Sequence, residues 1–181
     1  MKKGGSSLIK KAEEFAEEKH MGQKRKDGSS YMEHPKRVAA IVKKFKKSHK
    51  IDELLITALL HDTLEDTDTD LVEISQNFGS LVALLVLELT SDKESVKMIG
   101  KTRYLKEKLK NPKKVDSWAL VIKLADRLDN VSDLQNMDKR FREKYITETK
   151  KILGSLEKGR KLSKTHKNLI KEIKNNLKSA N

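Results

Sequence analysis

The sequence contains no cysteine, which excludes a disulfide framework and any metal site built on thiolates. Aromatic residues make up only 4% of the chain and are scattered, so a stacking platform for single-stranded nucleic acid is poorly supported. No window approaches the ~18 apolar residues of a membrane-spanning helix. The charged N-terminus also lacks the apolar stretch of a signal peptide. We therefore expect a soluble, cytoplasmic protein.

Positively charged residues outnumber negatively charged ones. The 181 residues include 40 Lys and Arg against 27 Asp and Glu, a net charge of +13. Such a balance suits an anionic partner, whether nucleic acid, a membrane surface or a phosphate-rich small molecule, and it does not choose among them. The length is sufficient for one domain with a substantial core.

Helical periodicity dominates the chain, and strand-like alternation is nowhere convincing. We predict an all-α helical bundle of roughly eight to ten helices, as one domain over residues 1–181. Its core would span about 8–156, and a basic helical extension over about 157–181 would cap the bundle, mediate assembly or attract anions. In the first half of the chain we expect a helix capped by Ser6 or Ser7, one from Pro35 to about Lys47, and one from an Asp52 cap to near Asp66. A short helix from Asp68 or Thr69 to Gly79 follows, and Ser80 begins the next. The remaining helices are expected over 95–110, 115–134, 138–155 and 161–178.

Residue types that bind metals recur at three separated places. His34 stands just before a helix, His61 and Asp62 lie late in a second, and Asp126 lies inside a third. Two imidazoles and two carboxylates suit a divalent ion such as Mn²⁺, Fe²⁺ or Zn²⁺. A cation would also offset the cost of burying the acids. Asp126 could instead pair with a basic residue of its own helix.

Two further acids, Glu65 and Asp66, follow the His61–Asp62 pair by about one turn and return to the same helix face. If that pair holds a metal, a carboxylate there could orient or deprotonate a water molecule that the ion has made acidic. The competing interpretation is a solvated helix end with capping aspartates.

Three blocks of sequence carry a resemblance to a known family. They are "GQKRKDGSSYMEHPKRVA" (22–39), "ALLHDTLEDT" (58–67) and "KLADRLDNV" (123–131), with weaker similarity over 89–93 and 142–156. In these blocks the chain resembles the HD-domain metal phosphohydrolases. It is most similar to the small alarmone hydrolases among the RelA/SpoT homologues, including the metazoan SpoT-homologue type.

The resemblance implies one Mn²⁺ per active site and removal of the 3′-pyrophosphate of guanosine tetra- or pentaphosphate, which gives GDP or GTP. The implied ligands are His34, His61, Asp62 and Asp126, and the implied catalytic acids are Glu65 and Asp66. We expect hydrolysis without synthetase activity, because 181 residues leave no room for a synthetase domain. Two alternatives at the same metal site stay open, namely adenosine alarmones and the 2′-phosphate of NADPH.

The resemblance also implies residues that bind the nucleotide. Arg25 and Lys26 match the family's RK pair, and a guanidinium plane can stack on a purine while an ammonium meets a phosphate. The other candidates are Tyr31 and Asn130, which match pocket positions, and Lys97 and Arg103, which could face phosphates. For Tyr31 a packing role is an equal alternative. We expect a packing role for His20, no function for His49 or His166, and no nucleic-acid partner, while the oligomeric state and the role of Asp129 stay open.

Overall fold

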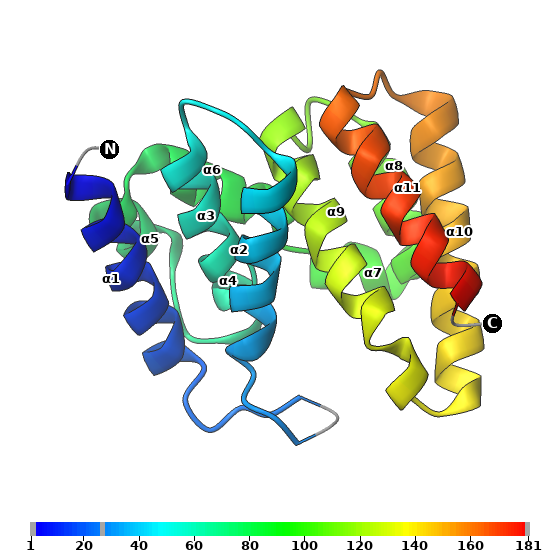
Figure 1. The fold of residues 1–181 in the computed structure, drawn as a ribbon, viewed down its shortest axis with the longest axis horizontal. Coiled ribbons are helices and arrows are strands. Elements are labelled where there is room, and N and C mark those ends of the chain that lie inside the picture. The colour runs from blue at the N-terminus through cyan, green and yellow to red at the C-terminus, as the bar shows by residue number, and fades with distance from the viewer. Residues whose placement is uncertain (1–2, 26–27, 180–181) are drawn as a thin grey trace. The chain divides into compact units, whose positions relative to one another are not determined.

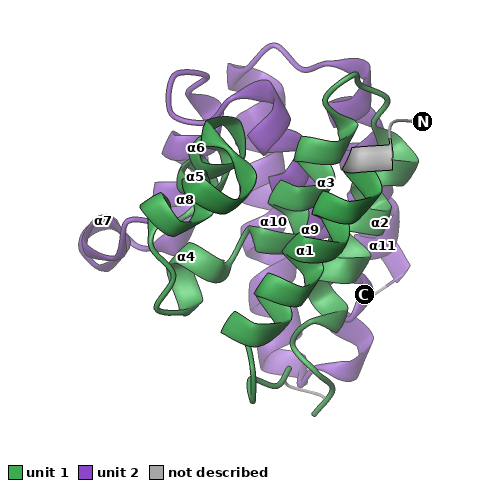
Figure 2. Cartoon of the chain, turned by 90° about the vertical axis from the view of Figure 1, so that its left-hand side faces the viewer, with its two compact units in different colours: residues 1–90 green, residues 91–181 purple. Residues whose placement is uncertain are grey.

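A computed structural model of the chain describes residues 3–25 and 28–179 (Figure 1). Within these residues there are only helices, turns and one isolated bridge between Lys24 and Ser30, which confirms the predicted all-α class. The chain divides into two compact units, residues 1–90 and 91–181 (Figure 2). The assignment of a single domain stays a prediction. No helix in the described part of the chain is long and apolar enough to span a membrane.

The first unit is built around one buried helix. Its helices are α1 (Lys3–Lys19), α2 (Glu33–Phe45), α3 (Ile51–Leu60), α4 (Thr63–Asp66), α5 (Leu71–Phe78) and α6 (Ser80–Leu89). Helix α3 packs against α1, α2 and α6, and every residue from Leu54 to Leu60 is buried. Ala12 and Ala16 give α1 a small-residue face in the same apolar cluster. The apolar run of α3 is therefore the core of this unit.

The second unit consists of longer and more basic helices. These are α7 (Lys93–Ile99), α8 (Lys101–Lys110), α9 (Ser117–Ser132), the 3-10 helix η1 (Leu134–Asn136), α10 (Lys139–Gly159) and α11 (Lys164–Ser179). Helix α11 packs along α9, and α10 packs along α8. Leu169, Ile173 and Leu177 recur every fourth residue and are buried on α11. The C-terminal helix is thus an integral part of this unit.

Several predicted helix ends were wrong. The first helix begins at Lys3, so Ser6 and Ser7 lie inside it, and the third begins at Ile51, so Asp52 lies in its first turn. The third helix also ends at Leu60 and not near Asp66, and two turn residues separate it from α4. The region 95–110 forms two helices, α7 and α8.

The break between α7 and α8 falls at Gly100, which adopts a φ of 81°. That left-handed conformation is readily accessible only to glycine and ends the helix. Three aspartates that follow no periodic signal act as N-caps in this unit: Asp92, Asp116 and Asp138 each accept a hydrogen bond from a backbone N–H one turn or less ahead.

His166 follows a lysine-rich stretch of the sequence, which is typical of an exposed position, but it is buried in the structure. Its side chain is buried at the start of α11, where Nε2 lies 2.9 Å from the backbone oxygen of Ser117. A carbonyl only accepts, so Nε2 carries the proton and Nδ1 accepts from the N–H of Ser163 at 3.2 Å. The imidazole therefore fixes the beginning of α11 to the beginning of α9.

Two neighbouring leucines of α6 test this packing. Leu85 is 1% exposed and Leu84 is 51% exposed, although they share one helix and one residue type. We expect Leu85→Ala to lower the free energy of unfolding by about 2–5 kcal/mol, because it leaves a cavity. Leu84→Ala should change it by less than about 0.5 kcal/mol. Urea denaturation followed by circular dichroism measures both, and equal effects would contradict the placement of α6.

Candidate metal and catalytic site

The first unit interrupts its central helix at the His61–Asp62 pair. His61 ends α3 with helical backbone angles, whereas Asp62 has φ −106° and ψ −6°. The carbonyl of Asp62 then accepts from the N–H groups of Glu65 at 3.1 Å and Asp66 at 2.9 Å, which forms the single turn of α4. The Thr63 hydroxyl donates to the carbonyl of Leu60 at 2.8 Å and covers the broken end of α3. The pair therefore lies at a junction between two helices.

His61 is held in one tautomer. Its Nδ1 lies 2.8 Å from the carbonyl oxygen of Ala58, so Nδ1 is the donor and Nε2 of the neutral ring bears a lone pair. Nε2 is buried and has no hydrogen-bond partner within the described part of the chain. This orphaned nitrogen is available to bind a cation.

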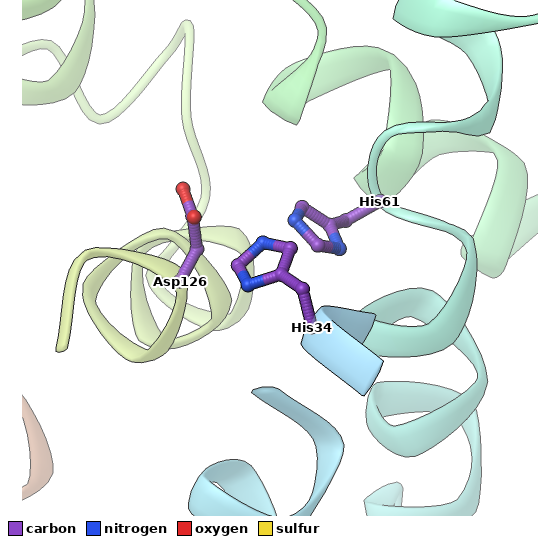
Figure 3. A group of neighbouring side chains, drawn as sticks. All are labelled: His34, His61 and Asp126. Atoms are coloured by element: carbon purple, nitrogen blue, oxygen red, sulfur yellow. The ribbon is translucent and has the colours of Figure 1, made fainter. Parts of the chain in front are cut away.

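The Asp62 carboxylate faces that nitrogen. Its Oδ2 lies 3.0 Å from His61 Nε2 and 3.9 Å from His34 Nε2, and it accepts a 2.6 Å hydrogen bond from the Tyr31 hydroxyl. The imidazoles of His34, from α2, and His61 lie with their centroids 5.2 Å apart (Figure 3). Three candidate metal ligands of the first unit therefore lie close together.

The donor set fits a divalent cation. Two electron-rich atoms, a lone-pair nitrogen and a carboxylate oxygen, are 3.0 Å apart without forming a hydrogen bond. Adjacent ligands around an ion with bonds near 2.1 Å are separated by about 3 Å. Imidazole and carboxylate together favour a transition metal of intermediate hardness. A cation between these atoms would remove their repulsion, and otherwise the pair needs a shared proton.

The two predicted catalytic acids follow directly. Glu65 is half-buried and Asp66 is exposed. The backbone oxygen of Asp66 accepts from Nε2 of Gln23 at 3.1 Å, which attaches the acidic turn to the loop before α2. Beyond it, Lys19 lies 3.0 Å from Glu73, and this hydrogen bond raises the pKa of the lysine. Sequence reasoning missed Gln23, since no periodic or charge signal distinguishes it.

The loop between α1 and α2 supplies the substrate-binding candidates of this unit. It closes on itself through the Arg25 N–H, which donates to the carbonyl of Ser29 at 2.9 Å. Arg25 is half-buried, and Lys26 lies outside the described residues. His20 stacks on Tyr31 with centroids 4.5 Å apart, in agreement with its expected packing role. Tyr31 thus combines packing on His20 with a hydrogen bond to a candidate ligand.

In the second unit, Asp126 is a buried carboxylate on α9, and Figure 3 labels its side chain. Its Oδ2 lies 2.9 Å from the ammonium of Lys123, and its Oδ1 accepts from the amide of Asn130 at 2.5 Å. The ion pair within the helix, expected as an alternative, is therefore present. It also orients the carboxylate, because each oxygen has one fixed donor.

The residues around Asp126 are buried as well. Arg127 donates to the hydroxyl of Thr149 at 2.9 Å and lies 4.9 Å from the centroid of the Tyr145 ring. Burial raises the pKa of the Tyr145 hydroxyl, although the Arg127 charge opposes the shift. Asp129, whose role the sequence left open, is 3% exposed and so does not simply face solvent.

The last two substrate-binding candidates lie on other helices of the second unit. Lys97 is exposed in the last turn of α7. Arg103 is exposed on α8, and its Nε donates to Glu107 at 3.0 Å. The contacts found for Arg103 therefore involve a neighbour on its own helix, and neither residue gains support as a ligand-binding group from its surroundings.

Comparison with known proteins identifies relatives over most of the chain. The profile of the HD domain family matches residues 12–161. A guanosine-3′,5′-bis(diphosphate) 3′-pyrophosphohydrolase of Aquifex aeolicus is 43% identical over 154 residues, which are 82% of this chain and 21% of the relative. The human guanosine-3′,5′-bis(diphosphate) 3′-pyrophosphohydrolase MESH1 is 34% identical over 179 residues, 92% of this chain and 95% of the relative.

A solved structure agrees with these matches. This structure was reported as "A metazoan ortholog of SpoT hydrolyzes ppGpp and plays a role in starvation responses". Its superposition on this chain has a TM-score of 0.78 at 27% sequence identity. The likeness covers 96% of this chain and 95% of that structure. The chain thus spans about a fifth of the Aquifex relative and nearly the full length of the human one.

The hydrogen bond from Tyr31 to Asp62 yields a prediction about metal affinity. Tyr31→Phe removes the hydroxyl but keeps the ring that stacks on His20. We expect it to weaken binding of a divalent cation ten- to hundredfold, because such supporting hydrogen bonds orient a ligand. Tyr104→Phe, which removes a hydroxyl that accepts a hydrogen bond from the Asp92 N–H, is the control and should bind normally. Calorimetric titration measures both, and equal affinities would contradict a supporting role for Tyr31.

Proposed function

Because the chain belongs to the HD-domain family, we propose that it is a phosphohydrolase that holds one divalent cation and cleaves a phosphorylated nucleotide. The family assignment confirms the resemblance carried by the three sequence blocks. The observation that carries the proposal is the 3.0 Å approach of His61 Nε2 to Asp62 Oδ2, two ligand atoms with no hydrogen bond between them. The cation proposed is Mn²⁺, which suits mixed imidazole and carboxylate ligands.

The proposed ligands come from both units of the chain. His34, His61 and Asp62 belong to the first unit, and Asp126 belongs to the second. The family profile runs from residue 12 to residue 161 and so includes parts of both units in one domain. The match therefore covers all four proposed ligands. The hydrogen bonds of Asp126 to Lys123 and Asn130 would then orient the fourth ligand.

The proposed substrate is guanosine tetra- or pentaphosphate, and the proposed reaction removes its 3′-pyrophosphate. The support is the names of the Aquifex and human relatives, both 3′-pyrophosphohydrolases of guanosine-3′,5′-bis(diphosphate). A water oxygen forms a bond to the phosphorus attached to O3′, and the P–O3′ bond breaks. A proton reaches O3′, so the products are pyrophosphate and GDP or GTP. We propose hydrolysis alone, in the cytoplasm.

The acids after the ligand pair are assigned the proton transfers. The bound cation would supply Lewis-acid chemistry, which makes water acidic enough to act as a nucleophile at neutral pH. Glu65 and Asp66 follow Asp62 within one turn, and their N–H groups both bond its carbonyl. One carboxylate can accept the proton of the attacking water, and the other can orient the water or return a proton to O3′.

The remaining candidates are assigned to substrate binding. Arg25 would stack on the guanine, and Lys26 would bind a phosphate as a point charge. Tyr31 and Asn130 would line the nucleotide pocket beside the ligands that they hydrogen-bond. Lys97 and Arg103 would attract the phosphates, and for Arg103 this requires exchange of its ion pair with Glu107.

The first experiment measures pyrophosphate release from guanosine tetraphosphate with Mn²⁺ and with EDTA. We expect release only with the metal, with GDP as the second product. The adenosine analogue and NADPH are assayed in parallel. Release of phosphate from NADPH alone would keep the metal site and replace the substrate, whereas no turnover of any of the three would overturn the proposed function.

The roles of the acids can be separated from metal binding. We expect Glu65→Gln and Asp66→Asn each to lower kcat at least a hundredfold, because general acid–base catalysis contributes ~10²–10⁴-fold. Both variants should retain normal Mn²⁺ affinity by calorimetry. Asp68→Asn changes a nearby exposed acid that lies 3.7 Å from Lys19 and should retain activity. Full activity in both acid variants would refute the assignment.

A further inference from the structure

The net positive charge of the chain belongs to one unit. Residues 1–90 contain 15 Lys and Arg and 15 Asp and Glu, so the first unit is neutral. Residues 91–181 contain 25 Lys and Arg and 12 Asp and Glu, so the second unit carries the full net charge of +13. The excess is therefore concentrated in the unit that contains α7 to α11.

The lysines gather in a groove between α8 and α10. This groove has a volume of about 450 Å³. Its lining contains no carboxylate, and its residues are Lys106 and Lys110 from α8 and Lys150, Lys151, Gly154, Ser155, Lys158 and Gly159 from α10. We call it the lysine groove. In the described structure, none of its five ammonium groups has an acidic partner within 4.0 Å.

Small residues of α10 form the floor of the lysine groove. A Cβ atom on Gly159 would lie 2.5 Å from the side chain of Lys110, so the glycine allows the lysine stem to rest on the helix backbone. Nothing lies within 4 Å of the corresponding position on Gly154, which leaves the groove open there. Arg160 donates to the carbonyl of Leu109 at 2.8 Å and fixes the end of α10 to α8. The groove is thus bounded by a defined contact between two helices.

The groove continues into two neighbouring hollows of about 620 and 540 Å³, which share Lys106 with it. Together they follow α10 from Lys144 to Gly159, about 22 Å at 1.5 Å per residue. Their only acids are Glu107, which pairs with Arg103, and Glu148. No aromatic residue lines any of the three. The result is an elongated, cationic and non-stacking surface.

A second basic groove, between α10 and α11, differs in character. It has a volume of about 920 Å³, and its lining includes Leu162 and Ile170 as well as lysines. It also contains Glu157, whose carboxylate lies 2.7 Å from the ammonium of Lys174. Part of its charge is already neutralised, so it provides a control of similar location and charge.

We propose that the lysine groove binds the phosphodiester backbone of a nucleic acid without reading its bases. Lysines without acidic partners repel one another, and like charges one helical turn apart are destabilising, so an anion would relieve them. Phosphates recur about every 3.4 Å along one strand, and a surface about 22 Å long accommodates several of them. The absence of aromatic residues excludes base stacking, which makes binding independent of sequence and dependent on salt.

The lysine groove itself is separate from the proposed hydrolase site, although Arg103, a candidate for substrate binding, lines one of the neighbouring hollows and is left unchanged in the test. The expectation against a nucleic-acid partner was based on the metal ligands, whereas the lysine groove contains none of them. Neither Lys106, Lys110 nor Lys151 belongs to the residues assigned to metal, catalysis or substrate. Binding and turnover are therefore measured independently, and failure of one leaves the other standing.

The test uses fluorescence anisotropy with a labelled 20-base-pair duplex of random sequence, prepared as DNA and as RNA. We expect binding to both, with an observed affinity that falls as salt rises. The slope of log affinity against log salt should be about −4.5 if all five lysines meet phosphates. No binding of either duplex at 50 mM salt would overturn the proposal, as would binding only to vesicles containing phosphatidylserine.

Two triple variants with the same change of charge locate the site. The groove variant carries K106Q, K110Q and K151Q, and the control carries K167Q, K171Q and K178Q on α11. We expect the groove variant to lose at least tenfold in affinity, with a salt slope shallower by about 2–3, and the control to lose threefold or less. Equal losses would show a diffuse charge effect and overturn the groove. Melting curves confirm folding, and K106Q alone, expected to lose about twofold or more, serves if the triple variant unfolds.

Discussion

The Asp62 carboxylate is the group on which the candidate metal site depends. Its Oδ2 atom receives the Tyr31 hydroxyl and lies 3.0 Å from a lone-pair nitrogen of His61. Two electron-rich atoms at that separation in a half-buried position require a proton or a cation between them. The need for a positive charge thus follows from how the first unit folds, before any relative is considered.

The break between α3 and α4 makes this approach feasible. Adjacent residues of an uninterrupted helix project ~100° apart, which would direct His61 and Asp62 to different neighbours. The turn at these residues brings their ligand atoms together, while the Asp62 carbonyl immediately starts α4 and returns the next two acids to the junction. The Thr63 hydroxyl donates to the carbonyl of Leu60 at the end of α3, and the Thr67 hydroxyl donates to the carbonyl of Thr63 in α4. A local loss of helix is thereby matched by side-chain hydrogen bonds.

Sequence patterns predicted the helical class but not the contacts between side chains, and the assignment of His61 and Asp62 as ligands stays a prediction. Apolar runs such as Leu54–Leu60 specify a buried helix by periodicity, and the family assignment followed from blocks of motif. The break at His61 was not predictable, because no glycine or proline marks it. The burial of His166 was not predicted, because its neighbours in the sequence are basic. Its hydrogen-bond partners are Ser163 and Ser117, and the contact with Ser117 exists only because α11 packs on α9.

The net charge alone does not distinguish steering of an anionic substrate from direct binding of an anion, but the distribution of the charge does. A diffuse field can steer an anionic substrate whatever its detailed layout, although salt limits its range to about 10 Å at 0.1 M. Steering therefore does not require five lysines to line one acid-free groove, where their mutual repulsion opposes folding. Natural sequences can disperse such charges or pair them with carboxylates, as Lys174 and Glu157 are paired on the adjacent face. Because the lysine groove does neither, its charge is best explained by an anion that contacts it directly.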